Sequence, residues 1–145
     1  MAFIRKCIFI ILLCPLFVSG IKAQTVYYPH GASRLLKSTA EDAGSLFGRA
    51  INNSLLSIQE YTVLPSSGII FIYDSTITDN QLCKVESNGS TFIRFTAAQD
   101  NGLVFGLYQY FDELGYRFYQ PGQIWEVTPT LSNPYRLLNK SYTNA

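Results

Sequence analysis

The sequence has few of the residues from which catalytic and metal-binding sites are usually built. Among its 145 residues there are one histidine, one tryptophan, one methionine and three cysteines. With His30 as the single histidine, no two-histidine zinc motif exists, and a serine–histidine–aspartate triad would have to use this side chain. His30 follows Tyr28-Pro29 and precedes a glycine, so we interpret it as a solvated loop residue. The sequence predicts no catalytic residues, no cofactor and no metal site.

Paired carboxylates, which glycoside hydrolysis requires, are also scarce. Asp112 and Glu113 are adjacent on an expected helix, where neighbours do not face one another, and we interpret them as solvated. Glu41 and Asp42 lie near an expected helix start, where the helix dipole stabilises negative charge. The sequence contains no glycine-rich phosphate loop. Neither acidic pair therefore predicts an acid–base site.

The chain begins with the pattern of a secretory signal. Arg5 and Lys6 precede an apolar run over residues 7–18, and small residues lead to Ala23. The run of about 12 residues is shorter than the ~20 that span a bilayer, although an uncleaved membrane anchor is the alternative. We expect residues 1–23 to be a signal peptide cleaved after Ala23. The protein is then secreted or periplasmic, with no membrane attachment after cleavage.

Cleavage would change the composition of the chain. It removes three of the 11 basic residues and none of the 10 acidic ones, which leaves a net charge of about −2. The mature chain then has no basic patch, so nucleic acid is not expected as a partner. Cys83 is then the single remaining cysteine, so it has no partner for an internal disulfide. The remaining ~122 residues suffice for one domain with its own core, which we assign to residues 24–130.

Periodicity in the first half predicts a strand, a helix and a second strand. Residues 25–28 favour a short strand. Ser38 and Glu41 fit a capping box, and apolar residues at helical spacing then predict a helix over residues 39–53. Residues 68–73, Gly-Ile-Ile-Phe-Ile-Tyr, do not alternate with polar residues. This pattern predicts a strand that is covered on both faces.

A hairpin is expected around Asn88-Gly89, a pair that favours a two-residue type I′ turn. The returning strand, residues 91–95, would place Thr91, Ile93 and Phe95 on one face of the sheet.

The second half contains the clearest helical pattern. Asp100 is a suitable N-cap, an apolar stripe covers residues 101–114, and Gly115 is a natural stop. Gly102 and Gly106 lie on the same side of this helix. In a membrane such a pair would suggest helix dimerisation, whereas in a soluble domain it lets a helix lie close to a sheet, which is the interpretation we favour.

The expected order is strand, helix, strand, hairpin, helix, strand. It predicts an α+β fold, a two-layer mixed β-sheet with two main helices packed on one face. The other face of the strand at residues 68–73 would then expose an apolar surface of several hundred Å². The apolar character of this second face would be explained by a packing partner, or by coverage from the loop around Pro65 and the C-terminal tail. Residues 131–145 are polar and are expected to be a linker without regular structure.

The last expected strand, residues 116–119, ends at a Pro-Gly turn with aromatic and amide side chains around it. Aromatic rings suit the apolar faces of sugars, amides bind hydroxyl groups, and tyrosine and tryptophan are also common interface residues. Burial in the core is a third role for these rings. The candidate residues for a domain interface or sugar contact are Arg117, Tyr119, Gln120 and Trp125.

Residues 100–122, DNGLVFGLYQYFDELGYRFYQPG, carry a resemblance to a known domain. The helix has the pattern Gly, two residues, aromatic, Gly, aliphatic, Tyr, and Leu-Gly-aliphatic-Arg-aromatic-aromatic-x-Pro-Gly follows it. The segment resembles the N-terminal accessory domain of α-glucuronidases and β-N-acetylhexosaminidases (chitobiase domain 2-like) and of related secreted glycoside hydrolase-like proteins. Tyr116 departs from the usual Val or Ile. The resemblance extends over about residues 25–129.

The resemblance implies a zincin-like fold of the hexosaminidase N-terminal domain type, here without a zinc motif. It also implies a C-terminal (β/α)8 catalytic domain as the partner, toward which residues 131–145 would lead. In the resembled glycosidases the catalytic carboxylates lie in that barrel, so none is carried onto this chain. The expected function is that of a non-catalytic domain in carbohydrate degradation, with glycans as further partners. The alternatives are a free-standing carbohydrate-binding module and a self-associating secreted structural protein.

Overall fold

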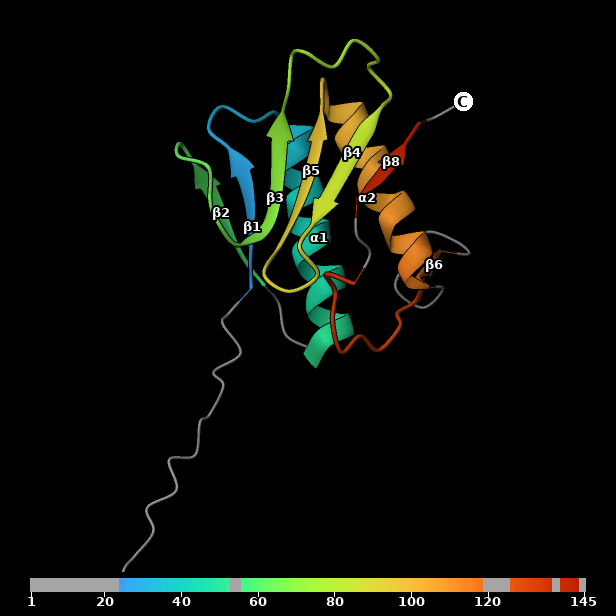
Figure 1. The fold of residues 1–145 in the computed structure, drawn as a ribbon. Coiled ribbons are helices and arrows are strands. Elements are labelled where there is room, and N and C mark those ends of the chain that lie inside the picture. Colours follow the sequence, from blue (N-terminus) through green and yellow to red (C-terminus); the bar gives the residue numbers. More distant parts are fainter. Residues whose placement is uncertain (1–23, 53–55, 119–125, 137–138, 144–145) are drawn as a thin grey trace, which may run out of the picture.

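The protein is built from an open mixed sheet with two helices packed against one of its faces (Figure 1). A computed structural model describes residues 24–52, 56–118, 126–136 and 139–143. The elements are β1 (Thr25–Pro29), α1 (Arg34–Asn52), β2 (Ser57–Tyr61), β3 (Gly68–Tyr73), β4 (Cys83–Ser87), β5 (Phe92–Ala97), α2 (Asp100–Leu114), β6 (Arg117–Phe118), β7 (Glu126–Val127) and β8 (Lys140–Tyr142). This two-layer α+β architecture confirms the fold class expected from the sequence.

The main sheet has six strands in the order β2-β1-β3-β5-β4-β8. Strands β2, β1, β3 and β5 are mutually parallel, whereas β4 is antiparallel to both β5 and β8. Strand β2, with the sequence SIQEY, was not expected, because an exposed edge strand lacks the apolar pattern that reveals a buried one. The short strands β6 and β7 form a separate antiparallel pair.

Helix α1 begins earlier than the sequence suggested. Ser33 caps it, since its hydroxyl oxygen accepts a hydrogen bond from the Leu36 backbone N–H at 3.0 Å. The capping box expected at Ser38 and Glu41 is wrong, because both residues are exposed inside the helix, and the first turn holds no acidic residue. The dipole explanation for Glu41 and Asp42 is therefore wrong too. The physical reason is burial: the stripe facing the sheet already starts at Leu36.

Helix α2 matches its expected range to within one residue. Gly115 has φ 102°, and the N–H groups of Gly115 and Tyr116 donate to the carbonyls of Asp112 and Phe111 at 3.0 Å each. This left-handed stop was predicted and is confirmed. Asp100 is the first helical residue rather than the N-cap, which is Gln99 and makes no side-chain cap bond.

The glycines of α2 allow the helix to lie directly on the sheet. A Cβ atom at Gly106 would lie 2.2 Å from Cys83 Sγ, and one at Gly102 would lie 2.8 Å from the Cβ of Ala97. Both separations are far below van der Waals contact. The interpretation of the glycine pair as a close helix–sheet contact is confirmed.

The core between the helices and the sheet is rich in aromatic rings. Ring centroids are 4.7 Å apart for Phe47 and Phe111, and 5.5 Å apart for both Phe71–Phe95 and Phe95–Tyr110. All five side chains are fully buried and come from α1, α2, β3 and β5. The tilted pair joins the two helices, the stacked Phe71–Phe95 pair joins neighbouring strands, and the edge-on Phe95–Tyr110 pair joins the helix layer to the sheet.

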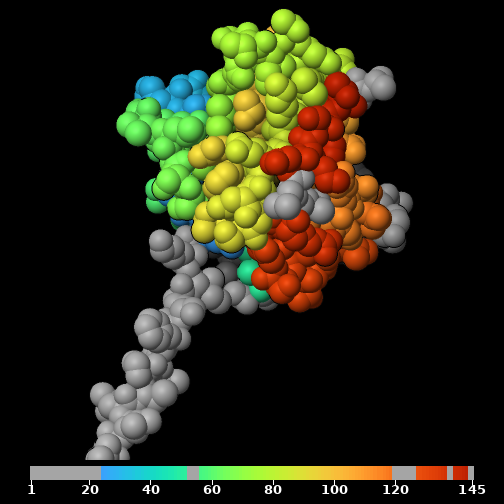
Figure 2. All heavy atoms as spheres, viewed as in Figure 1, coloured from blue at the N-terminus to red at the C-terminus, as the bar shows by residue number. Residues whose placement is uncertain are grey.

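The second face of β3 is covered by the chain itself. Ile70 points away from the helices and is nevertheless fully buried. Residues 62–67 pass from β2 to β3 on the viewer's side of β1, and they form part of the surface in Figure 2. The Tyr61 hydroxyl donates to the Phe71 carbonyl at 2.8 Å and adds to this cover. Coverage of both faces is confirmed, whereas the expected exposed apolar face is wrong.

The hairpin of β4 and β5 exists, but its turn is longer than expected. The register pairs Ser87 with Ile93, which a two-residue type I′ turn at Asn88-Gly89 does not allow. Instead, Asn88 Oδ1 accepts hydrogen bonds from the N–H groups of residues 90, 91 and 92. Ile93 and Phe95 share one face of the strand as predicted, and both are buried, whereas Thr91 is exposed and precedes the strand.

The C-terminal segment belongs to the domain. Lys140–Tyr142 forms β8 at the edge of the sheet, so the expectation of no regular structure after residue 130 is wrong there. Leu131 and Tyr135 are buried, and the Leu131 N–H donates to the carbonyl of Ala50 at 2.8 Å. These apolar residues are too widely spaced to form a periodic pattern, which is why composition alone suggested a linker.

Candidate functional site

The candidate site lies where the parallel strands end. Strands β1, β3 and β5 run in the same direction, so their carboxyl ends meet at one edge of the sheet. The start of α1 follows β1, and the start of α2 follows β5 after two residues. Polar residues of these three connections therefore gather at the same edge, which is where open α/β sheets commonly bind ligands.

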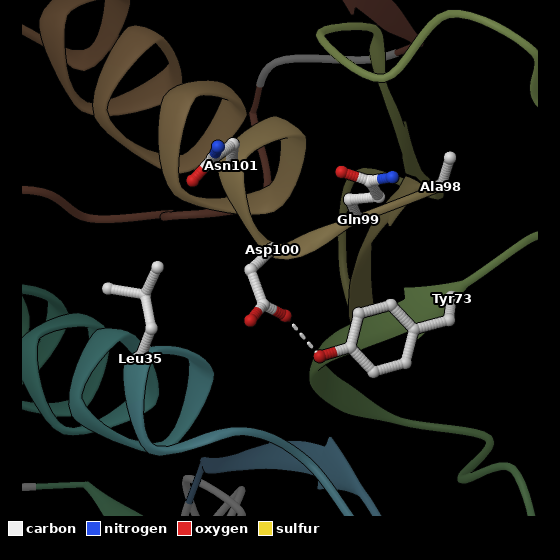
Figure 3. A pocket seen from close by; sticks show the side chains of 6 residues that line it. All are labelled: Leu35, Tyr73, Ala98, Gln99, Asp100 and Asn101. Atoms are coloured by element: carbon white, nitrogen blue, oxygen red, sulfur yellow. Dashed lines mark hydrogen bonds between the residues drawn. The ribbon is translucent and has the colours of Figure 1, made fainter.

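Asp100 is the centre of this site. Ser33 donates its hydroxyl to Asp100 Oδ2 at 2.5 Å, and the Tyr73 hydroxyl donates to Asp100 Oδ1 (Figure 3). Burial raises the pKa of Tyr73 above its ordinary value, and the hydrogen bond and negative charge of Asp100 raise it further. The phenol therefore remains a protonated donor at neutral pH.

Beside this network the surface is hollowed. The hollow has a volume of about 420 Å³ and opens to solvent. The side chains of Tyr73 and Leu35 remain exposed there, at 39% and 47% of their full surface. Its lining residues are Leu35, Tyr73, Ala98, Gln99, Asp100 and Asn101.

A second polar pair lies at the ends of β1 and β2. His30 Nδ1 is 3.2 Å from Glu60 Oε1, which also accepts the Gly31 N–H at 3.1 Å. The His30 side chain is 74% exposed, which confirms its interpretation as a solvated loop residue. Because His30 contacts Glu60 while Ser33 contacts Asp100, these residues do not form a catalytic triad.

One further potentially reactive side chain, a thiol, lies in the core. Cys83 is buried under α2, and burial raises the pKa of its thiol to about 12, which suppresses the nucleophilic thiolate. No group of three or more histidine, cysteine or acidic side chains able to hold a metal occurs in the part of the chain that the structure describes. Across the same residues, no helix combines the length and apolar character needed to cross a membrane.

Of the four residues proposed for an interface or sugar contact, only Arg117 is described. Tyr119, Gln120 and Trp125 lie outside the described residues. Arg117 Nη1 donates to the Tyr116 carbonyl at 2.6 Å and to the carbonyl and carboxylate of Asp112 at 2.9 and 2.7 Å. The guanidinium group thus binds the C-terminal end of α2, where a cation is favourable.

Neither the hollow nor the network beside it was expected from the sequence. Asp100 was expected to be a helix cap, and no role was predicted for Ser33, Tyr73 or Gln99. The available signal was positional, because each of these residues lies within four positions of the end of a strand in the parallel part of the sheet. The parallel register itself could not be read from the chain.

No family model matches the sequence, and no curated protein matches it. One similar solved structure is the GH20 β-N-acetylhexosaminidase from Streptomyces coelicolor A3(2), with 20% sequence identity and a TM-score of 0.45. The alignment covers 74% of this chain and 21% of that one, so this chain spans about a fifth of that protein. A likeness at this level supports no argument about function.

Proposed function

We propose that this chain is the non-catalytic N-terminal domain of a secreted glycoside hydrolase, which packs against a (β/α)8 catalytic domain of the same protein. The observation that carries the proposal is the structural role of residues 100–118, which are the described part of the segment that resembles such domains. Its glycines and buried aromatic residues serve packing and helix termination.

The glycines of the motif each have a steric reason. Gly106 and Gly102 allow α2 to contact Cys83 and Ala97, and Gly115 adopts the left-handed conformation that ends the helix. The motif is therefore a packing motif, as expected of a supporting domain.

The aromatic residues of the motif join α2 to α1. The Tyr116 side chain is fully buried, and its hydroxyl donates to the Leu46 carbonyl of α1 at 2.8 Å. The Tyr108 hydroxyl donates to Asp42 Oδ2 at 3.1 Å. A buried tyrosine with a satisfied hydroxyl group can replace the aliphatic residue that is usual at position 116, so this departure is compatible with the proposed role.

The surface proposed to face the catalytic domain includes the pair of strands β6 and β7. Val127 is 49% exposed and pairs with Arg117, so these two residues share one face of the strand pair, whereas Phe118, which is 42% exposed, lies on the opposite face. An exposed apolar side chain beside a positioned arginine has the composition of a protein interface. The sheet face opposite the helices contributes less than its sequence suggested, because Ile70 is already buried.

The proposal is tested by sequencing the transcript beyond the codon for Ala145. An open reading frame of a few hundred further codons, with the alternating strand and helix pattern of a barrel, is the expected result. A stop codon directly after Ala145 would contradict the proposal. Secretion is tested on the natural protein by N-terminal sequencing, which should start at Gln24. A chain that starts at Met1 would exclude the signal peptide.

A further inference from the structure

We propose that the hollow at the start of α2 is a binding site for a neutral sugar, one pyranose unit of a glycan. The inference does not depend on the proposed glycoside hydrolase role, because it rests on the position and lining of the hollow. It assigns to this domain a ligand of its own.

The position of the hollow is the first argument. From β1 the chain passes through α1 to β2 on one side, whereas from β3 it proceeds to β4 and β5 on the other. Adjacent parallel strands whose connections diverge leave a crevice beyond their carboxyl ends, and ligands bind there preferentially. The hollow is lined by Tyr73 at the end of β3, by residues 98–101 after β5 and by Leu35 of α1, the helix that follows β1, so it lies close to this reversal.

The lining provides the two kinds of contact that a sugar requires. The exposed ring of Tyr73 and side chain of Leu35 provide apolar surface for the C–H face of a pyranose. Gln99 and Asn101, both exposed, flank Asp100 with amide groups that can donate to and accept from hydroxyl groups.

Asp100 makes the site selective by charge. Its carboxylate is oriented by hydrogen bonds from Ser33 and Tyr73, and each oxygen keeps a further lone pair for a donor. A sugar hydroxyl can donate to it, whereas an anionic group would be repelled. The lining contains no cationic side chain that could offset this repulsion. The hollow should therefore accept neutral sugars and discriminate against uronates.

A purely structural role accounts for only part of this arrangement. The hydrogen bonds of Asp100 to Ser33 and Tyr73 hold α1, β3 and α2 together whether or not a ligand binds. Stability alone does not require two exposed amides and two exposed apolar side chains around the same hollow. The test must therefore measure ligand contact with Gln99 and Asn101 and leave the network intact.

The experiment is a titration of the 15N-labelled full chain, followed by NMR, with glucose and separately with glucuronate. These probes share a ring and differ in one carboxylate. The expected result is that glucose shifts the side-chain amide signals of Gln99 and Asn101, and that glucuronate does so more weakly. The proposal is overturned if neither probe shifts these signals, or if glucuronate binds as well as glucose.

Two variants make the test specific to the hollow. The double variant Gln99→Ala, Asn101→Ala removes both amides without touching the Asp100 network, and it should weaken glucose binding about tenfold. Gln109→Ala removes an exposed amide further along the same helix and should leave binding unchanged. Unchanged affinity in the double variant, or an equal loss in Gln109→Ala, would overturn the assignment of the hollow.

Discussion

Asp100 is the residue at which three elements of the fold meet. It belongs to the first turn of α2, and it accepts hydrogen bonds from Ser33 at the start of α1 and from Tyr73 at the end of β3. Hydrogen bonds to a charged acceptor are stronger than those between neutral groups. A single carboxylate thus sets the relative positions of both helix starts at the edge where the hollow lies.

Gly106 provides the first prediction at the residue scale. We expect Gly106→Ala to lower the free energy of unfolding by about 1–3 kcal/mol or more, because the new methyl group would overlap Cys83 Sγ. Urea unfolding measures this loss. The matched control is Gly44→Ala in α1, where the methyl group would meet the flexible Ile58 side chain at 3.3 Å and gains up to ~1 kcal/mol of helix propensity. Equal urea midpoints for the two variants would contradict the close contact.

At the scale of elements, the C-terminal segment completes both helices. The Leu131 N–H donates to the Ala50 carbonyl near the end of α1, and Arg136 Nη2 donates to the carbonyl of Leu114, the last residue of α2, at 3.3 Å. The Tyr110 hydroxyl donates to the Pro134 carbonyl at 2.7 Å inside the core. The last carbonyls of a helix have no partner within it, so this segment satisfies groups that α1 and α2 cannot.

The second prediction tests whether this segment belongs to the folded domain. Leu131→Ala should destabilise the protein by about 2–4 kcal/mol, because it removes a buried side chain. The control is Val63→Ala, whose side chain is 82% exposed and whose loss should stay within ~0.5 kcal/mol. Thermal unfolding of the two variants provides the comparison. A Leu131→Ala protein as stable as the control would mean that the segment is a linker after all.

For the whole molecule, stability should depend on alkaline pH. Burial raises the pKa of Tyr135 and of Cys83 to about 12 each, and raises those of Tyr116 and Tyr142 further. The folded chain therefore keeps protons that the unfolded chain releases near the ordinary values of about 8.5 for cysteine and 10 for tyrosine. This contribution is complete below those values and is lost as the pH rises through the folded values.

The third prediction follows because the raised pKa values make the folded state lose stability as the pH rises. The urea midpoint should stay level up to about pH 8 and then fall steadily above about pH 10, together with delayed ionisation of tyrosine in the folded state. Absorbance of tyrosinate and urea unfolding across this range measure both quantities. Tyr135→Phe should reduce the steepness of the fall, because one of the buried phenols is gone. A midpoint that does not change above pH 10 would contradict the raised pKa values.

The sequence predicted those helices and strands whose own residues form an apolar pattern with a clear end. Helix α2 combines a broad apolar stripe with a glycine stop, and β3 is an apolar run bounded by a glycine, so the bounds of both agree with the sequence to within one residue. Strands β2 and β8 lack such a signal, because each gains its structure by pairing with one neighbour at an edge of the sheet. The start of α1 was misplaced for a related reason, since burial of Leu36 extends the helix toward Ser33.

The amino-acid sequence by itself determined the α+β class, the close contact of α2 with the sheet and the scarcity of catalytic groups, because these follow from composition and from periodicity within one segment. Only the tertiary structure decided how Ser33, Tyr73 and Asp100 come together. They are separated by 40 and 27 positions along the chain, and parallel strand pairing brings them to one edge. That pairing depends on contacts between distant segments, which no local pattern records.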